Sequence, residues 1–296
     1  MSAPAVATSA PRAEPLAVAA AGVTLVLWAS GFVGIRAAGD DFSPGSLALL
    51  RVIVAGVVLG LMVAVKREPF PAWRNLPAVA VCGLLWFAGY SFLLNAGERK
   101  IDAGTAAMLV SLGPILIALL AGALLGEGFP RGLFLGCAIA FGGVALIAAA
   151  SSGEGRSGGW GTVLCLAAAL CYAGAVIAQK TALRTVGILQ LNFLCAVVAT
   201  LALLPATPSL SRDLGDAPAS SIAWVVYLGA FPMALAFTTW AYALARTSAG
   251  RLASTTYLVP AISILLGWAF LGETPAALAF LGGAICIAGV AVARRR

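Results

Sequence analysis

Residues 110–127 read VSLGPILIALLAGALLGE, and residues 256–273, 146 positions later, read TYLVPAISILLGWAFLGE. Eight of the 18 aligned positions are identical. Each copy is an uncharged apolar run that carries a proline near its start (Pro114 and Pro260) and ends in Gly-Glu. A second, weaker match aligns WASGFVGIR (28–36) with YAGAVIAQK (172–180), so that Arg36 corresponds to Lys180. The chain is therefore predicted to consist of two similar halves.

The composition places the protein in a membrane. Hydrophobic residues make up 61% of the 296 positions and charged residues only 10%, with a mean hydropathy of +1.02. A soluble protein has about a quarter of its residues charged. Uncharged runs such as 76–97 and 103–126 reach the roughly 20 residues that span a bilayer as a helix. Because the alternating pattern of membrane strands is absent, the sequence predicts an all-α integral membrane protein.

Short polar clusters divide the chain into ten expected transmembrane helices. They cover residues 16–36, 45–65, 76–97, 103–126, 131–151, 160–180, 188–206, 220–245, 251–272 and 275–293. Residues 1–15 are expected to be a cytoplasmic leader, 16–151 and 160–293 the two five-helix repeats, and 294–296 a basic tail. Because five is odd, the halves cross the membrane in opposite senses. Such an inverted repeat is typical of secondary transporters that bind substrate near the bilayer midplane.

The basic residues predict the orientation. With a cytoplasmic N-terminus, 12 Lys and Arg residues fall inside and five outside, which follows the positive-inside rule. We therefore expect both termini in the cytoplasm. On this interpretation the basic clusters, which give a net charge of +7, anchor the topology and bind no nucleic acid.

Several functional classes are disfavoured by residues that the chain lacks. It contains no histidine and no Gly-Lys-Ser/Thr triplet, which argues against the usual zinc sites, catalytic triads and ATP-binding loops. Its six cysteines all lie in apolar runs and form no CxxC pair, so we interpret them as packing residues. We expect no metal, no cofactor and no enzymatic activity, and a monomer surrounded by lipid.

A resemblance to a known family rests on the repeated segments 110–127 and 256–273 and on three further stretches: SPGSLALLR (43–51), GGVALI (142–147) and AGVAVA (288–293). The chain after residue 15 resembles the drug/metabolite transporter superfamily, in particular its EamA-like ten-helix branch. Members export amino acids and other metabolites, and within this branch the chain most resembles the YddG-type aromatic amino acid exporters. The resemblance implies an exporter of bacterial origin that resides in the inner membrane.

Two prolines, two glutamates and one arginine within or at the ends of the expected helices each allow two interpretations. Pro114 and Pro260 break backbone hydrogen bonds and are expected to be hinges that line a cavity, with ordinary kinked packing as the alternative. Glu127 and Glu273 are interpreted as stabilising the start of the following helix, ahead of a role in proton coupling. Arg51 is the one charge well inside a span, and we expect its side chain to extend to the outer interface rather than to act in transport.

The polar and aromatic residues deep in the spans predict the substrate. No Asp, Glu or Lys is expected at mid-membrane, which argues against permanently cationic substrates and predicts transport without a proton gradient. A neutral or zwitterionic solute such as an amino acid fits best, with other metabolites or drugs as alternatives and a channel or a lipid-modifying enzyme as rivals. The expected substrate-binding residues are Trp28, Ser30, Trp86, Tyr90, Asn95, Ser111, Tyr172, Trp240 and Tyr257.

Overall fold

The structure, a computed structural model, describes residues 15–126, 129, 132–151, 156–247, 249–273 and 277–293. Within these ranges every regular element is a helix, which confirms the all-α prediction. Seven helical segments there are long and apolar enough to cross a membrane: Pro15–Ala38, Pro44–Lys66, Trp73–Glu98, Ala103–Leu124, Gly159–Ala182, Ile188–Asp216 and Ala219–Arg246. Leu258–Leu271 and Phe280–Gly289 are shorter apolar helices.

Some of the long segments consist of several elements joined end to end. In the first half these are α1 (Pro15–Ala38), α2 (Pro44–Lys66), η1 (Trp73–Asn75), α3 (Leu76–Cys82), η2 (Gly83–Tyr90), α4 (Ser91–Glu98), α5 (Ala103–Val110), α6 (Gly113–Leu124) and α7 (Leu133–Ser151).

The elements of the second half continue the chain. They are α8 (Arg156–Ala182), α9 (Ile188–Leu203), η4 (Leu204–Ala206), α10 (Thr207–Asp216), α11 (Ala219–Leu228), η5 (Gly229–Leu235), α12 (Ala236–Arg246), α13 (Ala249–Ala253), η6 (Ser254–Tyr257), α14 (Leu258–Leu271) and α15 (Ala277–Ala293).

Departures from regular α-helix recur at the spacing of the sequence repeat. The π-helix η2 begins at Gly83 and the π-helix η5 at Gly229, 146 residues apart. Gly126 and Gly272 end the two repeated segments with φ values of 69° and 66°, in the left-handed region that favours glycine. The two halves therefore share local backbone geometry as well as sequence.

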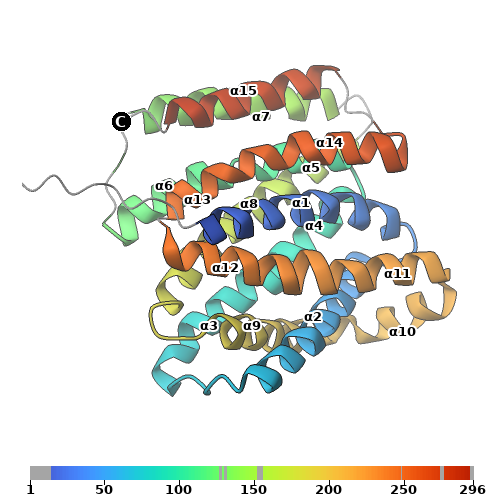
Figure 1. The fold of residues 1–296 in the computed structure, drawn as a ribbon. Helices are drawn as coiled ribbons and strands as arrows, with labels where there is room; N and C mark the ends of the chain where they lie inside the picture. Colours follow the sequence, from blue (N-terminus) through green and yellow to red (C-terminus); the bar gives the residue numbers. More distant parts are fainter. Residues whose placement is uncertain are drawn as a thin grey trace, which may run out of the picture.

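The packing between the halves follows the same correspondence. Helix α1 packs against α11, α12 and α14 of the second half, and α8 packs against α3, α4, α5 and α6 of the first. Corresponding helices also meet each other, as α2 contacts α9 and α7 contacts α15. Figure 1 shows α7 and α15 side by side at one edge of the molecule, with α1 and α8 near its middle. The centre of the bundle is therefore built from both halves.

The segment after residue 206 differs from the prediction. It was expected to be a polar loop, but residues 207–216 form the amphipathic helix α10, which extends the segment that begins at Ile188. Leu210 is buried, and the Asp213 carboxylate accepts hydrogen bonds from the Ser43 backbone N–H (2.8 Å) and from the Ser46 hydroxyl. A carboxylate at the first turn of α2 complements its N-terminal dipole. The tertiary contact with α2 thus stabilises a helix that the composition alone does not indicate.

Large apolar side chains cover much of the outer surface. Leu61, Leu201 and Trp268 are each more than 60% exposed, and similar residues occur on most of the helices. A soluble monomer rarely exposes so much contiguous apolar area, whereas lipid accepts it without cost. The chain is a multi-pass membrane protein.

Candidate functional site

A cluster of aromatic rings lies where the two halves meet. Trp28 of α1 contacts Trp240 of α12 with ring centroids 4.8 Å apart, and Trp86 of η2 contacts Phe237 of α12 at 4.7 Å. Tyr172 of α8 lies 5.4 Å from Trp86 and 6.2 Å from Trp28. Tilted and edge-on ring pairs at these distances attract each other beyond simple burial. The cluster thus joins α1 and η2 of the first half to α8 and α12 of the second.

Two members of this cluster are equivalent in the sequence repeat. Trp28 and Tyr172 open the aligned segments WASGFVGIR and YAGAVIAQK. A glycine makes room for the tyrosine: a Cβ added at Gly113 would lie 2.5 Å from the Tyr172 ring. Because that contact is far inside van der Waals distance, only glycine allows Tyr172 to lie against the start of α6.

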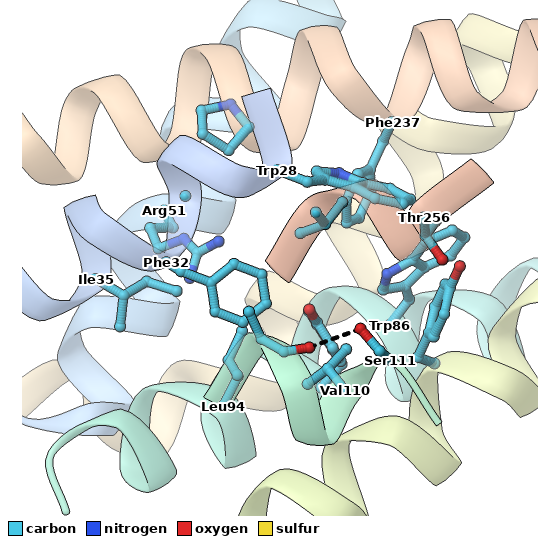
Figure 2. A pocket seen from close by; sticks show the side chains of 16 residues that line it. Trp28, Phe32, Ile35, Arg51, Trp86, Leu94, Val110, Ser111, Phe237 and Thr256 are labelled. Atoms are coloured by element: carbon cyan, nitrogen blue, oxygen red, sulfur yellow. Dashed lines mark hydrogen bonds between the residues drawn. The ribbon is translucent and has the colours of Figure 1, made fainter. Parts of the chain in front are cut away.

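A cavity adjoins the cluster (Figure 2). The centres of water molecules have access to about 50 Å³ of the cavity, which is room for several waters or a small organic group. Among the described residues that line it, Arg51 is the one charged side chain. The lining residues come from both halves: Trp28, Gly31, Phe32, Ile35, Arg51, Trp86, Tyr90, Leu94, Ala107, Val110, Ser111, Tyr172, Pro232, Phe237, Thr256 and Val259.

Arg51 lines the cavity, and the prediction that its side chain extends to the outer interface is wrong. The residue is only 5% exposed, and one terminal N–H of its guanidinium donates to Asn95 Oδ1 at 3.0 Å. Asn95 Nδ2 donates to the Pro44 carbonyl at 3.3 Å, which orients the amide oxygen toward the arginine. The contact between α2 and α4 therefore holds the guanidinium inside the protein.

The cavity also presents hydrogen-bonding groups of both kinds. The hydroxyls of Ser111 and Thr256 donate to the Ala107 and Ala253 carbonyls, at 2.9 and 2.6 Å, so their oxygens remain able to accept. Trp28 Nε1 is a buried donor without a hydrogen-bond partner among the described residues. An unpartnered donor in a buried cavity is costly unless a ligand or water accepts from it.

The repeated prolines lie beside the cavity at helix starts. Pro114 is the second residue of α6, after the break that separates it from α5, and Pro260 is the third residue of α14, after η6. A proline has no N–H to donate to the backbone carbonyl four residues earlier. Pro114 therefore leaves the Val110 carbonyl without this helical hydrogen bond, and Pro260 leaves the Thr256 carbonyl without it. Both Val110 and Thr256 line the cavity. The geometry is compatible with hinges, and that role remains a proposal.

An ion pair joins the halves at the end of the bundle where α1 ends. Arg36 Nε donates to Glu273 Oε1 at 2.7 Å, and both side chains are about one-quarter to one-third exposed. Arg36 also donates to the Glu98 backbone carbonyl at 3.4 Å. Glu98 lies just beyond the expected helix 76–97, but it is only 1% exposed because α4 continues through it. The helix-capping interpretation of Glu127 and Glu273 cannot be compared with the structure, because Glu127 and the residues after Glu273 lie outside the described ranges.

The structure brings together five of the nine residues proposed to bind substrate: Trp28, Trp86, Tyr90, Ser111 and Tyr172 line the cavity. Trp240 lies behind Trp28, fully buried, and Asn95 lies behind Arg51. Ser30 points elsewhere, to the Tyr227 hydroxyl 2.7 Å away and a separate hollow between α1, α11 and α14. Tyr257 belongs to η6, and its side chain is outside the described part of the structure.

Eleven of the 16 lining residues were not proposed as substrate-binding from the sequence, among them Phe32, Arg51, Phe237 and Thr256. Phe237 and Thr256 are ordinary in apolar helices, and nothing in their local sequence distinguishes them from lipid-facing positions. Arg51 was noticed and assigned to the interface. A helix-face argument could have found Phe32, because it lies four residues after Trp28 and so shares its face.

Comparison with known proteins identifies the family. The model of the EamA-like transporter family matches twice, over residues 15–149 and 159–295. The chain belongs to this family. The two matches coincide with the two halves of the repeat, and the expected membership of the drug/metabolite transporter superfamily is confirmed. Relatives of this EamA-like transporter are transporters rather than enzymes.

Individual relatives are similar over nearly the whole chain. A probable terminal-alkyne amino-acid exporter of Streptantibioticus cattleyicolor is 36% identical, covering 93% of this chain and 92% of its own. The uncharacterised transporter YdfC of Bacillus subtilis is 31% identical over 89% of this chain and 86% of its own length. The uncharacterised inner membrane transporter YedA of Escherichia coli is 28% identical, covering 90% and 87%. One solved crystal structure shares the fold, with a TM-score of 0.65 at 22% identity over 94% of this chain and 96% of that one.

Proposed function

We propose that this EamA-like transporter exports amino acids with apolar or aromatic side chains by alternating access. The observation that carries the proposal is the cavity between the halves, which combines an aromatic wall with a single charged side chain among its described lining residues. The rings suit an apolar body. Arg51, Trp28 Nε1 and the hydroxyl oxygens of Ser111 and Thr256 suit charged and polar head groups.

The alternating-access mechanism goes together with a second proposal, that the two halves form an inverted repeat. We propose ten membrane helices in two five-helix halves, 16–151 and 160–293, that cross the membrane in opposite senses. The recurrence of π-helices and left-handed glycines at an offset of 146 residues supports equivalent halves. If the halves exchange their local arrangements, inward-open and outward-open states have similar energies and the site is fixed between them.

The proposed location is a bacterial inner membrane, with both termini in the cytoplasm and the transporter acting as a monomer. The excess of basic residues on one side supports the orientation. In Figure 1 the start of α1 and the end of α15 lie at the same end of the bundle, as this orientation requires. An inner membrane transporter of Escherichia coli is among the relatives.

The substrate proposal has support from one relative. The Streptantibioticus cattleyicolor protein is named as a probable exporter of a terminal-alkyne amino acid, an amino acid with an apolar side chain. An aromatic cavity accommodates such side chains as well as aromatic ones. Other metabolites or drugs are the alternative substrates, and a channel is the alternative mechanism.

Counterflow in proteoliposomes tests the proposal. Vesicles containing purified protein are loaded with unlabelled phenylalanine or leucine and diluted into the labelled L-isomer. We expect saturable, stereoselective accumulation that is absent from protein-free vesicles. Conductance that does not saturate would indicate a channel. Saturable exchange of unrelated metabolites, with no response to amino acids, would assign a different substrate.

A further inference from the structure

The guanidinium of Arg51 has little compensation from its immediate surroundings. Of its five N–H donors, one bonds to the neutral amide oxygen of Asn95, and Nε has no hydrogen-bond partner among the described residues. Among the described residues the one ion pair is Arg36 with Glu273, so none of the described carboxylates contacts Arg51. A buried cation without a contacting anion is strongly disfavoured. The position therefore calls for an anionic ligand.

A nearby carboxylate does not remove that need. Glu98 is buried and close enough to interact electrostatically with Arg51, but it is not within ion-pair distance, and neither of its oxygens has a hydrogen-bond partner among the described residues. Asn95 lies one turn before Glu98 on α4, and its amide oxygen, not the Glu98 carboxylate, accepts the hydrogen bond from the guanidinium. The arginine is thus directed to the cavity rather than paired with the acid.

The cavity is polarised along its length. Figure 2 shows Arg51 beside Ile35 and Phe32 at one end, and Trp28, Trp86 and Phe237 at the other. Between the two ends the lining is mainly apolar. A ligand that matches this arrangement carries an anion at one end and an apolar body at the other. A guanidinium recognises a planar carboxylate with two parallel hydrogen bonds, which an ammonium group cannot reproduce.

We propose that Arg51 binds the carboxylate of the transported solute, and that Asn95 is a positioning residue that holds the guanidinium toward the cavity. The proposal rests on the proposed function, since it assigns the head-group subsite of the same cavity. It makes a free carboxylate a requirement for binding. Amides of the same solutes, which keep the apolar body and the amino group, should bind poorly.

The test compares acids with their amides. Quenching of tryptophan fluorescence, to which Trp28 and Trp86 in the cavity contribute, measures binding to the purified protein, and competition against counterflow measures use of the site. The probes are phenylalanine and phenylalaninamide, leucine and leucinamide, and 3-phenylpropionate and its amide. We expect the wild type to prefer each acid by roughly 10- to 100-fold, the loss that accompanies removal of a hydrogen-bonded charge.

The variants separate recognition from folding. Arg51→Gln should bring the acid-to-amide ratio close to one, and Arg51→Lys should restore only part of it. Asn95→Ala keeps the charge but removes its support, so the ratio should fall several-fold without reaching one. Arg74→Gln, at an exposed arginine of η1, is the matched control and should keep the wild-type ratio. Asn95→Ala and Arg51→Lys keep the test decisive if Arg51→Gln does not fold.

The outcomes distinguish the two proposals. If amino acids bind with the same ratio in wild type and Arg51→Gln, the transporter assignment stands and the role of Arg51 is wrong. If only 3-phenylpropionate binds, and does so through Arg51, the carboxylate subsite stands and the amino acid proposal fails. If the wild type binds each acid and its amide equally well, or if Glu98→Gln alone abolishes the preference for the acid, Arg51 does not bind the carboxylate and the inference is overturned.

Discussion

Arg36 Nε and Glu273 Oε1, 2.7 Å apart, connect the end of α1 in the first half to the end of α14 in the second. The residue before Arg36, Ile35, lines the cavity. The sequence repeat places Lys180 at the position equivalent to Arg36, and Lys180 Nζ donates to the Leu244 and Thr247 carbonyls at 2.7 and 2.6 Å, at the end of α12. In Figure 1 the end of α1 and the end of α12, where these two contacts are made, lie at opposite ends of the bundle.

Breaking the Arg36–Glu273 contact is expected to open that end of the transporter. A partly exposed ion pair contributes at most about 1 kcal/mol, so Glu273→Gln should shift the closed–open equilibrium roughly five-fold toward open. A cysteine introduced at Ile35 in a cysteine-free background reports the change through its rate of maleimide labelling. The exchanged pair Arg36→Glu with Glu273→Arg should return the rate toward wild type. Equal rates in all three proteins would exclude a gating role.

Truncating the aromatic wall is expected to weaken substrate binding. Trp86→Ala and Tyr90→Ala each remove a ring that lines the cavity, and losing such burial costs about 1–3 kcal/mol. The half-saturation concentration for an aromatic amino acid should rise roughly 5- to 150-fold. Trp160→Ala, at a residue 57% exposed, is the control. Lost transport in the control alongside wild-type kinetics in both cavity variants would place the site elsewhere.

Adding one methyl group at Gly113 is expected to displace Tyr172. The new Cβ would lie 2.5 Å from the ring, so Gly113→Ala forces Tyr172 toward the cavity or separates α6 from α8. Overpacking of this kind costs about 1–3 kcal/mol, which thermal unfolding in detergent would detect, and transport should fall with it. The matched change Gly142→Ala, where a Cβ meets nothing within 4 Å, should leave both properties unchanged. A stable and fully active Gly113→Ala protein would contradict the packing argument.

Transport is expected to proceed without a proton gradient. No Asp or Glu is among the described residues that line the cavity, so substrate binding there requires no proton exchange with a lining carboxylate. An imposed pH gradient across proteoliposomes should leave the initial rate of counterflow nearly unchanged. A strong acceleration that Glu98→Gln removes would show that this buried acid couples transport to protons. Glu273→Gln is the control for this comparison. Its carboxylate is held in the ion pair with Arg36, so this variant should leave the response to the pH gradient unchanged.

The orientation can be tested in sealed cells with a membrane-impermeant maleimide. Cysteines replacing Lys100 and Arg212, both exposed, should be labelled from outside because they lie in segments assigned to that face. A cysteine at Lys66, exposed at the end of α2, should be labelled only after the cells are permeabilised. The reverse pattern would invert the proposed topology.

Local sequence was sufficient for the class of protein and for part of its site. Apolar runs of membrane-spanning length determine helices whatever their neighbours are, and the duplicated segments carry the two-half organisation because a repeat is a property of the chain. The deep aromatics Trp28, Trp86 and Tyr172 could be recognised because large rings with polar atoms are uncommon in the middle of apolar helices. Trp86 and Tyr90 are four residues apart, a spacing that shares a face of an α-helix, and both line the cavity.

Only the tertiary structure decided which way each helix is turned and what its polar groups meet. Ser30 and Trp28 are two positions apart on α1, so the rotation that directs Trp28 to the cavity directs Ser30 to Tyr227. Arg51 could reach either the interface or the interior from its place on α2, and Asn95 on another helix selects the interior. The helical form of residues 207–216 depends likewise on Asp213 meeting the start of α2. In each case the deciding energy is a contact between segments distant in the chain, which periodicity and composition do not encode.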